Sequence, residues 1–218
     1  MFVVVDDDAE AWARFPDHHL WFNKLWLAEM LGYTCGPAGT SVPVSGQYIV
    51  RPTYNLSGMG VGARKCLLEV DDYRSVPPGF FWCEWFDGDH ISSTFVRVGD
   101  GWEVRSSWRG VRSGASLSRF AYWERCRESP DLHPFIASLT DVPVINVEFI
   151  GGRPIEVHLR DSPDPQGWGR IVPVWADELD DGGKWVDGVD RPGTFVASFD
   201  DADGFLEVPR IGFMITDE

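Results

Sequence analysis

The stretch INVEFIGGRPIEVHLR, residues 145–160, predicts two β-strands joined by a tight turn. Its Gly-Gly pair suits a short hairpin turn, because glycine readily adopts the positive φ values that such turns require. The arms are rich in Val and Ile, yet Glu148 lies on the first arm and Glu156 on the second. Two carboxylates on adjacent strands repel each other. The hairpin therefore predicts a bound cation or, as the simpler alternative, ion pairs with Arg153 or Arg160.

The other polar residues of this hairpin favour a divalent cation. Asn146 precedes Glu148 by two residues, and His158 follows Glu156 by two. Side chains alternate along a strand, so each of these residues shares a face with its glutamate. Carboxylate oxygens suit Mg²⁺, which keeps several waters and takes further ligands from nucleotide phosphates. We expect a Mg²⁺ site here.

The composition indicates one large domain or two small lobes with a substantial core. The 218 residues are 44% hydrophobic and 14% aromatic, which is enough to build such a core. The net charge of -15 argues against a surface for duplex nucleic acid, because neutralising phosphates needs clustered Lys and Arg. Arginines are concentrated between residues 97 and 127, which is compatible with a small anionic ligand.

The sequence predicts a cytoplasmic protein. Its four cysteines lie far apart without CxxC spacing, as is typical of reduced thiols. The apolar run at the start follows no basic region, so it indicates a first strand rather than a signal peptide. No apolar segment approaches the roughly 20 residues of a membrane span.

Hydrophobic periodicity and turn residues predict an α+β fold. Residues 9–32 show one helical pattern that ends near Gly32, and residues 48–70 read as a hairpin with a glycine-rich tip. Residues 80–86 read as an apolar strand, and a meander of antiparallel strands follows it. Residues 116–129 are predicted to be a helix, with a second helical segment near Pro134. After residue 161 the chain is acidic and rich in turns, and it ends in short strands.

Other candidate residues precede the hairpin. The glycines of the 57–62 loop can bring backbone N–H groups close to phosphates, although a flexible turn is an equal alternative. Arg51 ends an apolar strand and would face this loop; otherwise it is a surface arginine. Lys24 lies on the preceding helix, where a solvated face is the simpler interpretation. Glu84 interrupts the run FFWCEWF and needs a partner, either a nucleoside or an arginine.

In this order, the segments resemble the motifs of the ATP-grasp superfamily. FNKLWLAEMLG matches its "DK" helix, and YIVRPTYNLSGMGVG its "KP" strand and glycine loop. FFWCEWFDGDH matches the hinge strand, and INVEFIGGRPIEVHLR the final metal-binding hairpin. The resemblance covers roughly residues 17–161. It implies two lobes with antiparallel sheets that clasp a nucleotide, here residues 1–82 and residues 83–218.

The resemblance also implies roles for individual residues. ATP phosphates and base would be held by Lys24, Arg51, Ser57, Gly58, Gly60, Gly62, Glu84, Trp85, Phe86 and Asp89. Mg²⁺ would be held by Glu148, Glu156 and His158. Arg51, Arg109 (or Arg105) and Arg160 would stabilise the transferred phosphoryl group. Two positions depart from the family pattern: Arg51 replaces a lysine, and His158 replaces an asparagine.

The implied function is an ATP-dependent ligase that joins a carboxylate to an amine through an acylphosphate. Its partners would be small-molecule or peptide substrates, while the oligomeric state stays open. The exchange at Arg51 resembles an arginine–lysine-swapped clade found in phages and mobile elements. The two departures leave open an ATP-binding regulator or host-interaction protein without catalysis. The acidic tail leaves open, as a weaker alternative, a mimic of nucleic acid.

Overall fold

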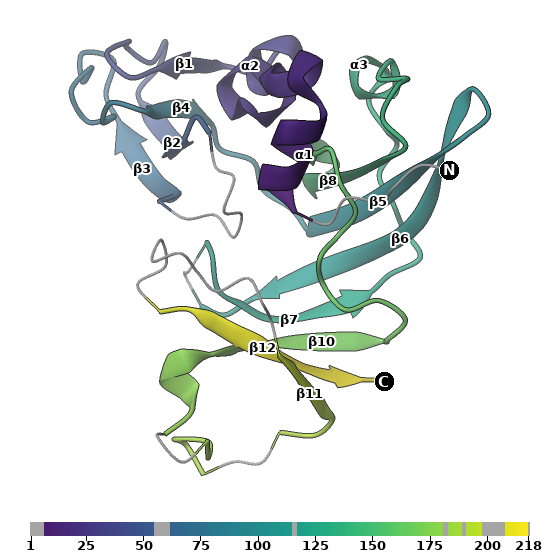
Figure 1. Ribbon diagram of the computed structural model, residues 1–218. Coiled ribbons are helices and arrows are strands. Elements are labelled where there is room, and N and C mark those ends of the chain that lie inside the picture. Colours follow the sequence, from purple (N-terminus) through teal and green to yellow (C-terminus); the bar gives the residue numbers. More distant parts are fainter. Residues whose placement is uncertain are drawn as a thin grey trace.

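The computed structural model describes residues 7–54, 62–114, 117–180, 183–188, 191–197 and 208–217. In this part of the chain, two antiparallel β-sheets form two lobes (Figure 1). The small sheet has the strand order β1-β4-β2-β3, and the large sheet has the order β11-β12-β10-β7-β6-β5-β8-β9. The expected α+β fold of two lobes with antiparallel sheets is confirmed.

The small sheet belongs to the first lobe. Its strands are β1 (Cys35–Pro37), β2 (Gly46–Pro52), β3 (Arg64–Leu68) and β4 (Phe80–Glu84). The predicted hairpin of residues 48–70 is therefore confirmed as β2 and β3. The predicted lobe boundary after residue 82 falls inside β4, which carries the first sheet on to Glu84.

The large sheet holds the rest of the strands. They are β5 (His90–Val98), β6 (Gly101–Arg112), β7 (Phe120–Arg125), β8 (Val144–Ile150), β9 (Arg153–His158), β10 (Arg170–Trp175), β11 (Thr194–Ala197) and β12 (Arg210–Thr216). The stretch at residues 145–160 forms β8 and β9, as predicted. Gly151 at its turn has a φ of 56°, and a Cβ there would lie 2.3 Å from the Asp87 carbonyl oxygen. Only glycine fits this contact between the hairpin and the end of the hinge segment.

The helices are short, and the single predicted helix at 9–32 is wrong. That segment forms α1 (Asp8–Arg14), the 3₁₀ helix η1 (Pro16–Phe22) and α2 (Lys24–Met30). Pro16 has no N–H to continue α1, and the Asn23 side chain accepts from the Trp26 N–H to start α2. Two further helices are α3 (Pro134–Ala137) and η2 (Ala176–Glu178). None of the helices in the described residues is long and apolar enough to cross a membrane.

The predicted helix at residues 116–129 is also wrong, because its centre is strand β7. This strand pairs with β6 along one edge and with β10 along the other. Trp123 has helix-compatible spacing in the sequence but is buried against the large sheet with Trp108 and Ile171. Hydrogen bonds to strands on both sides override the local helical pattern.

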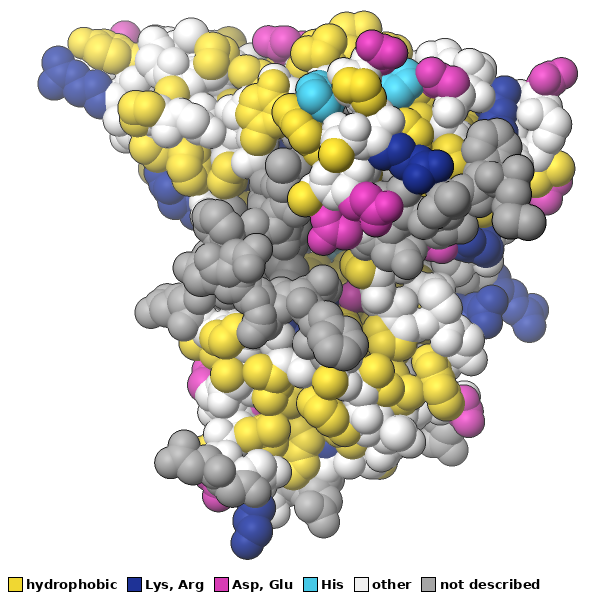
Figure 2. All heavy atoms as spheres, viewed as in Figure 1, with side chains coloured by type: hydrophobic (Ala, Val, Ile, Leu, Met, Phe, Trp, Pro, Cys, Tyr) yellow, Lys and Arg dark blue, Asp and Glu magenta, His cyan; other side chains and the backbone are white. Residues whose placement is uncertain are grey.

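The main core joins the helices to one end of the large sheet. Apolar side chains of α1, η1, α2 and α3 pack on β5, β8 and β9, and Figure 1 shows α1 and α2 above β8. This packing fixes α1 and α2 next to the polar face of the β8–β9 hairpin. On the face drawn in Figure 2, Lys and Arg side chains stand apart from one another and form no continuous basic surface.

Candidate functional site

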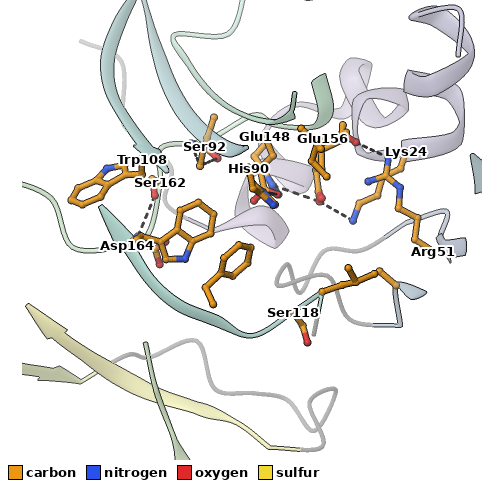
Figure 3. Close-up of a pocket in the computed structure, with 18 of the residues that line it drawn as sticks. Lys24, Arg51, His90, Ser92, Trp108, Ser118, Glu148, Glu156, Ser162 and Asp164 are labelled. Atoms are coloured by element: carbon orange, nitrogen blue, oxygen red, sulfur yellow. Dashed lines mark hydrogen bonds and ion pairs between the residues drawn. The ribbon is translucent and has the colours of Figure 1, made fainter. Parts of the chain in front are cut away.

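A cavity lies between the two sheets, and side chains of both sheets and of α1 and α2 line it. Its volume of about 200 Å³ is several times the share of one water, so it has room for a ligand of several atoms. Figure 3 shows Lys24 and Arg51 on one side, His90, Glu148 and Glu156 in the middle, and Trp108, Ser162 and Asp164 on the other side. The cavity therefore brings together polar residues from the whole length of the chain.

The two glutamates of the β8–β9 hairpin, Glu148 and Glu156, face this cavity side by side. Glu148 pairs with Glu156 in the strand register, as Asn146 does with His158. All four residues line the cavity, which confirms that they share a face. Lys24 Nζ lies 2.9 Å from Glu156 Oε1, so a lysine rather than Arg153 or Arg160 forms the ion pair.

Glu148 is held as a carboxylate by its neighbours. Burial alone would raise its pKa, but a 3.0 Å hydrogen bond from His90 Nε2 and the charges of His158 and Lys24 outweigh this and lower the pKa to about 2. The carboxylate is therefore ionised at any physiological pH and is available to a cation.

Lys24 is positioned by the start of α2. Its backbone N–H donates to the carbonyl of Thr53, 2.9 Å away. This hydrogen bond fixes α2 beside the end of β2, the strand that carries Arg51. Lys24 is only 5% exposed, so the predicted solvated helix face is wrong for this residue. Its ammonium points into the cavity.

Asp8 is a residue of this site that the sequence analysis missed. Its carboxylate accepts from Arg160 Nε at 2.7 Å and contacts His158 Nδ1 at 3.0 Å. Burial raises the pKa of Asp8, but His158 and Arg160 outweigh it and hold the pKa far below its usual value. The available signal was the acidic run before α1, in which Asp7 caps the helix and leaves Asp8 to face inward.

These contacts favour a positioning task for His158. Burial would lower its pKa, but the Asp8 carboxylate more than offsets this and raises the pKa above the usual 6.5. A protonated imidazole has no lone pair for a metal. The contacts of His158 with Asp8 therefore make it a weaker Mg²⁺ candidate than Glu148 and Glu156.

The raised pKa of His158 predicts a pH dependence of folding. The proton on His158 stabilises the folded state fully below pH 6.5, and this contribution is lost as pH rises through the raised folded pKa. We expect the free energy of unfolding to fall as the pH rises above 6.5, and we expect the fall to be smaller in His158→Gln. Urea unfolding across this range measures both. Identical pH profiles in the two proteins would contradict the assignment.

Arg51 faces the cavity from β2. Its Nη2 donates to the Ile155 carbonyl at 2.8 Å, and its guanidinium lies 5.2 Å from the centre of the Phe81 ring. Its Nε is buried and has no hydrogen-bond partner in the described part of the chain. Arg51 forms no ion pair with the described residues, so its charge remains available to an anionic ligand.

The hinge residues also line the cavity, as predicted. They are Glu84, Trp85 and Phe86, which lead from β4 toward β5. Glu84 Oε1 accepts from the Thr34 N–H at 2.8 Å, so a backbone group is its partner here. Of the predicted glycine loop, Gly62 is described and has a φ of 74°. Ser57, Gly58 and Gly60 lie outside the described residues.

Three predicted site residues do not reach the cavity. Arg109 is 46% exposed and pairs with Glu124, and Asp89 is 70% exposed near Arg109. Arg105 pairs with Asp161. The structure therefore places these side chains on the surface of the large lobe: β6 directs Arg105 and Arg109 away from the cavity face, and Asp89 lies in the exposed segment before β5.

The cavity also has an aromatic side that the sequence analysis missed. Its lining includes Trp108, Phe120, Trp123 and Trp175, together with Arg112. These residues come from β6, β7 and β10. These residues converge because β7 pairs with β6 and β10. The local sequence pattern predicted a helix there and so did not indicate this pairing.

The paired glutamates fit Mg²⁺ bound together with a nucleotide. The described residues contain no cluster of three or more His, Cys, Asp or Glu side chains that could hold a metal. Mg²⁺ bound through nucleotide phosphates needs only one or two carboxylates, because waters and phosphates complete its shell. Glu148 and Glu156 meet this requirement from adjacent positions of the hairpin.

No model of a known protein family matches the chain, and no curated protein matches it.

Solved structures do resemble the chain. N5-carboxyaminoimidazole synthetase from Staphylococcus aureus has a TM-score of 0.53 at 11% identity, over 91% of this chain and 68% of that one. An ADP complex of N5-carboxyaminoimidazole ribonucleotide synthetase has a TM-score of 0.52 at 11% identity, over 90% and 67%. This likeness shows the fold: the chain has the ATP-grasp fold, as the sequence predicted.

The chain is shorter than the proteins that it resembles. An ATP-grasp superfamily protein from Archaeoglobus fulgidus matches with a TM-score of 0.41 at 15% identity, over 72% of this chain. The chain spans only 50% of the length of that protein.

Proposed function

We propose that the protein is an ATP-dependent ligase that joins a carboxylate to an amine or a related nucleophile. The observation that carries the proposal is the cavity itself. It presents buried Lys24 and Arg51, which forms no ion pair with the described residues, from one side and the adjacent carboxylates of Glu148 and Glu156 from the large sheet. The two basic residues can bind phosphates, and the two neighbouring carboxylates can bind a metal. This arrangement suits a nucleotide that is bound together with Mg²⁺.

In the proposed reaction, a substrate carboxylate oxygen attacks the γ-phosphorus of ATP. The bond from that phosphorus to the bridging oxygen breaks, and ADP leaves with the electron pair. An amine then attacks the acylphosphate carbon, phosphate leaves, and the amine loses a proton. Catalysis of this kind rests on positioning and on charge neutralisation, so no nucleophilic side chain is required.

We assign roles to the residues that line the cavity. Arg51 and Lys24 bind phosphate oxygens, and Trp85 and Phe86 provide an apolar contact for the base. Glu148 and Glu156 hold Mg²⁺, which supplies positive charge at the phosphates. Asp8 keeps both His158 and the Arg160 guanidinium fixed beside it.

The fold neighbours support the nucleotide half of the proposal. One of them is an ADP complex of N5-carboxyaminoimidazole ribonucleotide synthetase. In addition, the sequences of the hinge segment and of the β8–β9 hairpin resemble the corresponding motifs of ATP-grasp enzymes. By Arg51 we place the protein in the arginine–lysine-swapped clade of phages and mobile elements, and we expect it in the cytoplasm.

A second candidate is an ATP-binding regulator without turnover. Two of the cavity's cations are already neutralised, because Lys24 pairs with Glu156 and Arg160 pairs with Asp8. If these pairs persist when ATP binds, the γ-phosphate lacks the cations that transfer requires. The mimic of nucleic acid gains no such support from the described residues.

The test measures ATP binding and turnover separately. We expect ATP with Mg²⁺ to raise the melting temperature more than ATP with EDTA. We expect ADP release to require one member of a panel of carboxylates together with an amine. Stabilisation without ADP release across the panel would favour the regulator. No stabilisation by ATP would overturn both candidates.

A further inference from the structure

The cavity continues beyond the groups assigned to ATP and Mg²⁺ into an aromatic recess, formed by Trp108, Phe120 and Trp123 with Arg112 at its edge. The Phe120 and Trp123 rings lie 4.3 Å apart between centroids. The His90 ring meets both of them edge-on, at 5.1 Å and 5.3 Å. These three rings therefore pack against one another as an aromatic part of the cavity lining.

Arg112 brings a positive charge into this recess. Its guanidinium contacts His90 Nδ1 at 3.4 Å and lies 5.9 Å from the centre of the Phe120 ring. It forms no ion pair with the described residues; burial lowers its pKa, and the charge of Glu148 partly offsets this effect. A partly buried cation without a direct ion pair favours an anionic ligand.

Arg51 and Arg112 form no ion pair with the described residues, and they lie on different parts of the cavity. Arg51 lies on β2 in the small lobe, and Arg112 ends β6 in the large sheet, opposite Phe120 of β7. ATP phosphates neutralise the first in the proposed function, which leaves the second for another anion.

Trp108 forms part of the wall of the recess. Its side chain lines the cavity, while its indole Nε1–H is buried within the protein and has no hydrogen-bond partner among the described residues. The indole therefore serves as a reporter of a ligand that contacts this wall.

A hydrogen-bond chain ties Arg112 to the reaction centre. A guanidinium only donates, so its contact makes His90 Nδ1 the acceptor and leaves the ring proton on Nε2. That proton is donated to Glu148 Oε2, 3.0 Å away. Arg112 is thereby held beside one of the two carboxylates assigned to Mg²⁺.

We propose that Arg112 and the aromatic recess bind the acceptor substrate, and that this acceptor is a carboxylic acid on a planar, apolar body. This inference rests on the proposed function. The guanidinium fork matches a carboxylate with two N–H groups, and the aromatic faces contact the planar body. A neutral aromatic leaves the Arg112 charge unpaired, and a small aliphatic acid leaves the recess unfilled.

The test uses indole-3-carboxylate as the probe without ATP. Its matched partners are indole-3-carboxamide, which lacks the charge, and acetate, which lacks the ring. Binding is followed by the ¹⁵N shift of the Trp108 indole, assigned with Trp108→Phe, and by calorimetry. We expect the carboxylate to bind at least tenfold tighter than either partner.

The variants separate Arg112 from other arginines. Arg112→Gln is expected to weaken binding of indole-3-carboxylate at least tenfold, and Arg112→Lys less. The control is Arg97→Gln, because Arg97 also lies over a tryptophan, Trp102, but outside the cavity. Its affinity for the probe is expected to equal that of the wild type.

Two results would overturn the inference: equal affinity for carboxylate and carboxamide, or unchanged affinity in both Arg112 variants. If ATP and Mg²⁺ still stabilise the protein in that case, the proposed function stands and only the acceptor class is wrong. Carboxylate binding without any ATP stabilisation would instead overturn the proposed function.

Discussion

The Asp8→Asn variant is expected to lose about 3–5 kcal/mol of unfolding free energy, because it breaks a buried ion pair and leaves its partners uncompensated. The Asp8 side chain is 3% exposed and contacts both Arg160 and His158. Removing its charge leaves two buried positive groups 3.3 Å apart. Urea unfolding at pH 7 measures the loss, since the Asp8 contribution is complete above the ordinary carboxyl pKa.

The matched control is the neighbouring Asp7→Asn. Asp7 is exposed and caps α1 by accepting from Ala9 and Glu10 N–H groups. Asparagine caps helices as well as aspartate does, so this change is expected to cost less than about 0.5 kcal/mol. A loss of similar size in both variants would show that Asp8 has no special role. A partial rescue of Asp8→Asn by His158→Gln would support the pairing.

Glu148→Gln and Glu156→Gln are each expected to reduce ADP release by about 100-fold or more. Losing roughly 3 kcal/mol of metal and phosphate stabilisation corresponds to two powers of ten in rate. The assay uses ATP, Mg²⁺ and the best acceptor of the panel. The stabilisation by ATP is expected to lose its dependence on Mg²⁺ in the same variants, while the fold without ligand is monitored by circular dichroism.

Glu124→Gln is the control for the removal of one carboxylate. Glu124 pairs with Arg109 on the outer side of the large sheet, away from the cavity. It is expected to retain wild-type ADP release. Because Glu156 also neutralises Lys24, Glu148→Gln is the decisive variant if Glu156→Gln unfolds. Unchanged ADP release in a folded Glu148→Gln would remove Glu148 from the metal site.

The accuracy of the sequence analysis differed between elements for physical reasons. The hairpins of residues 48–70 and 145–160 were predicted because their turns and alternation are local properties. The helices at 9–32 and 116–129 were not. Pro16 and Asn23 divide the first segment, and the second gains its hydrogen bonds from β6 and β10, which are distant in sequence.

The sequence also predicted some residues of the candidate site and missed others. Lys24, Arg51, Glu84, Glu148 and Glu156 line the cavity as predicted. Arg109 lies outside it because it points to the outer face of β6, and Asp89 lies outside it in the exposed segment before β5. Asp8 and Arg112 were missed because a single acid before a helix and a single arginine among many carry no local signal.

The sequence by itself determined the composition of the β8–β9 hairpin, the glycine turn at residues 151–152 and the order of the segments that the ATP-grasp fold requires. Those features depend on residues close together in the chain. Only the tertiary structure decided that Lys24 pairs with Glu156, that Asp8 fixes Arg160, and that Arg112 faces the cavity in contact with His90 and without an ion pair among the described residues. The reason is physical: the charge state and availability of a buried group depend on which distant charges the packing of helices and sheets brings beside it.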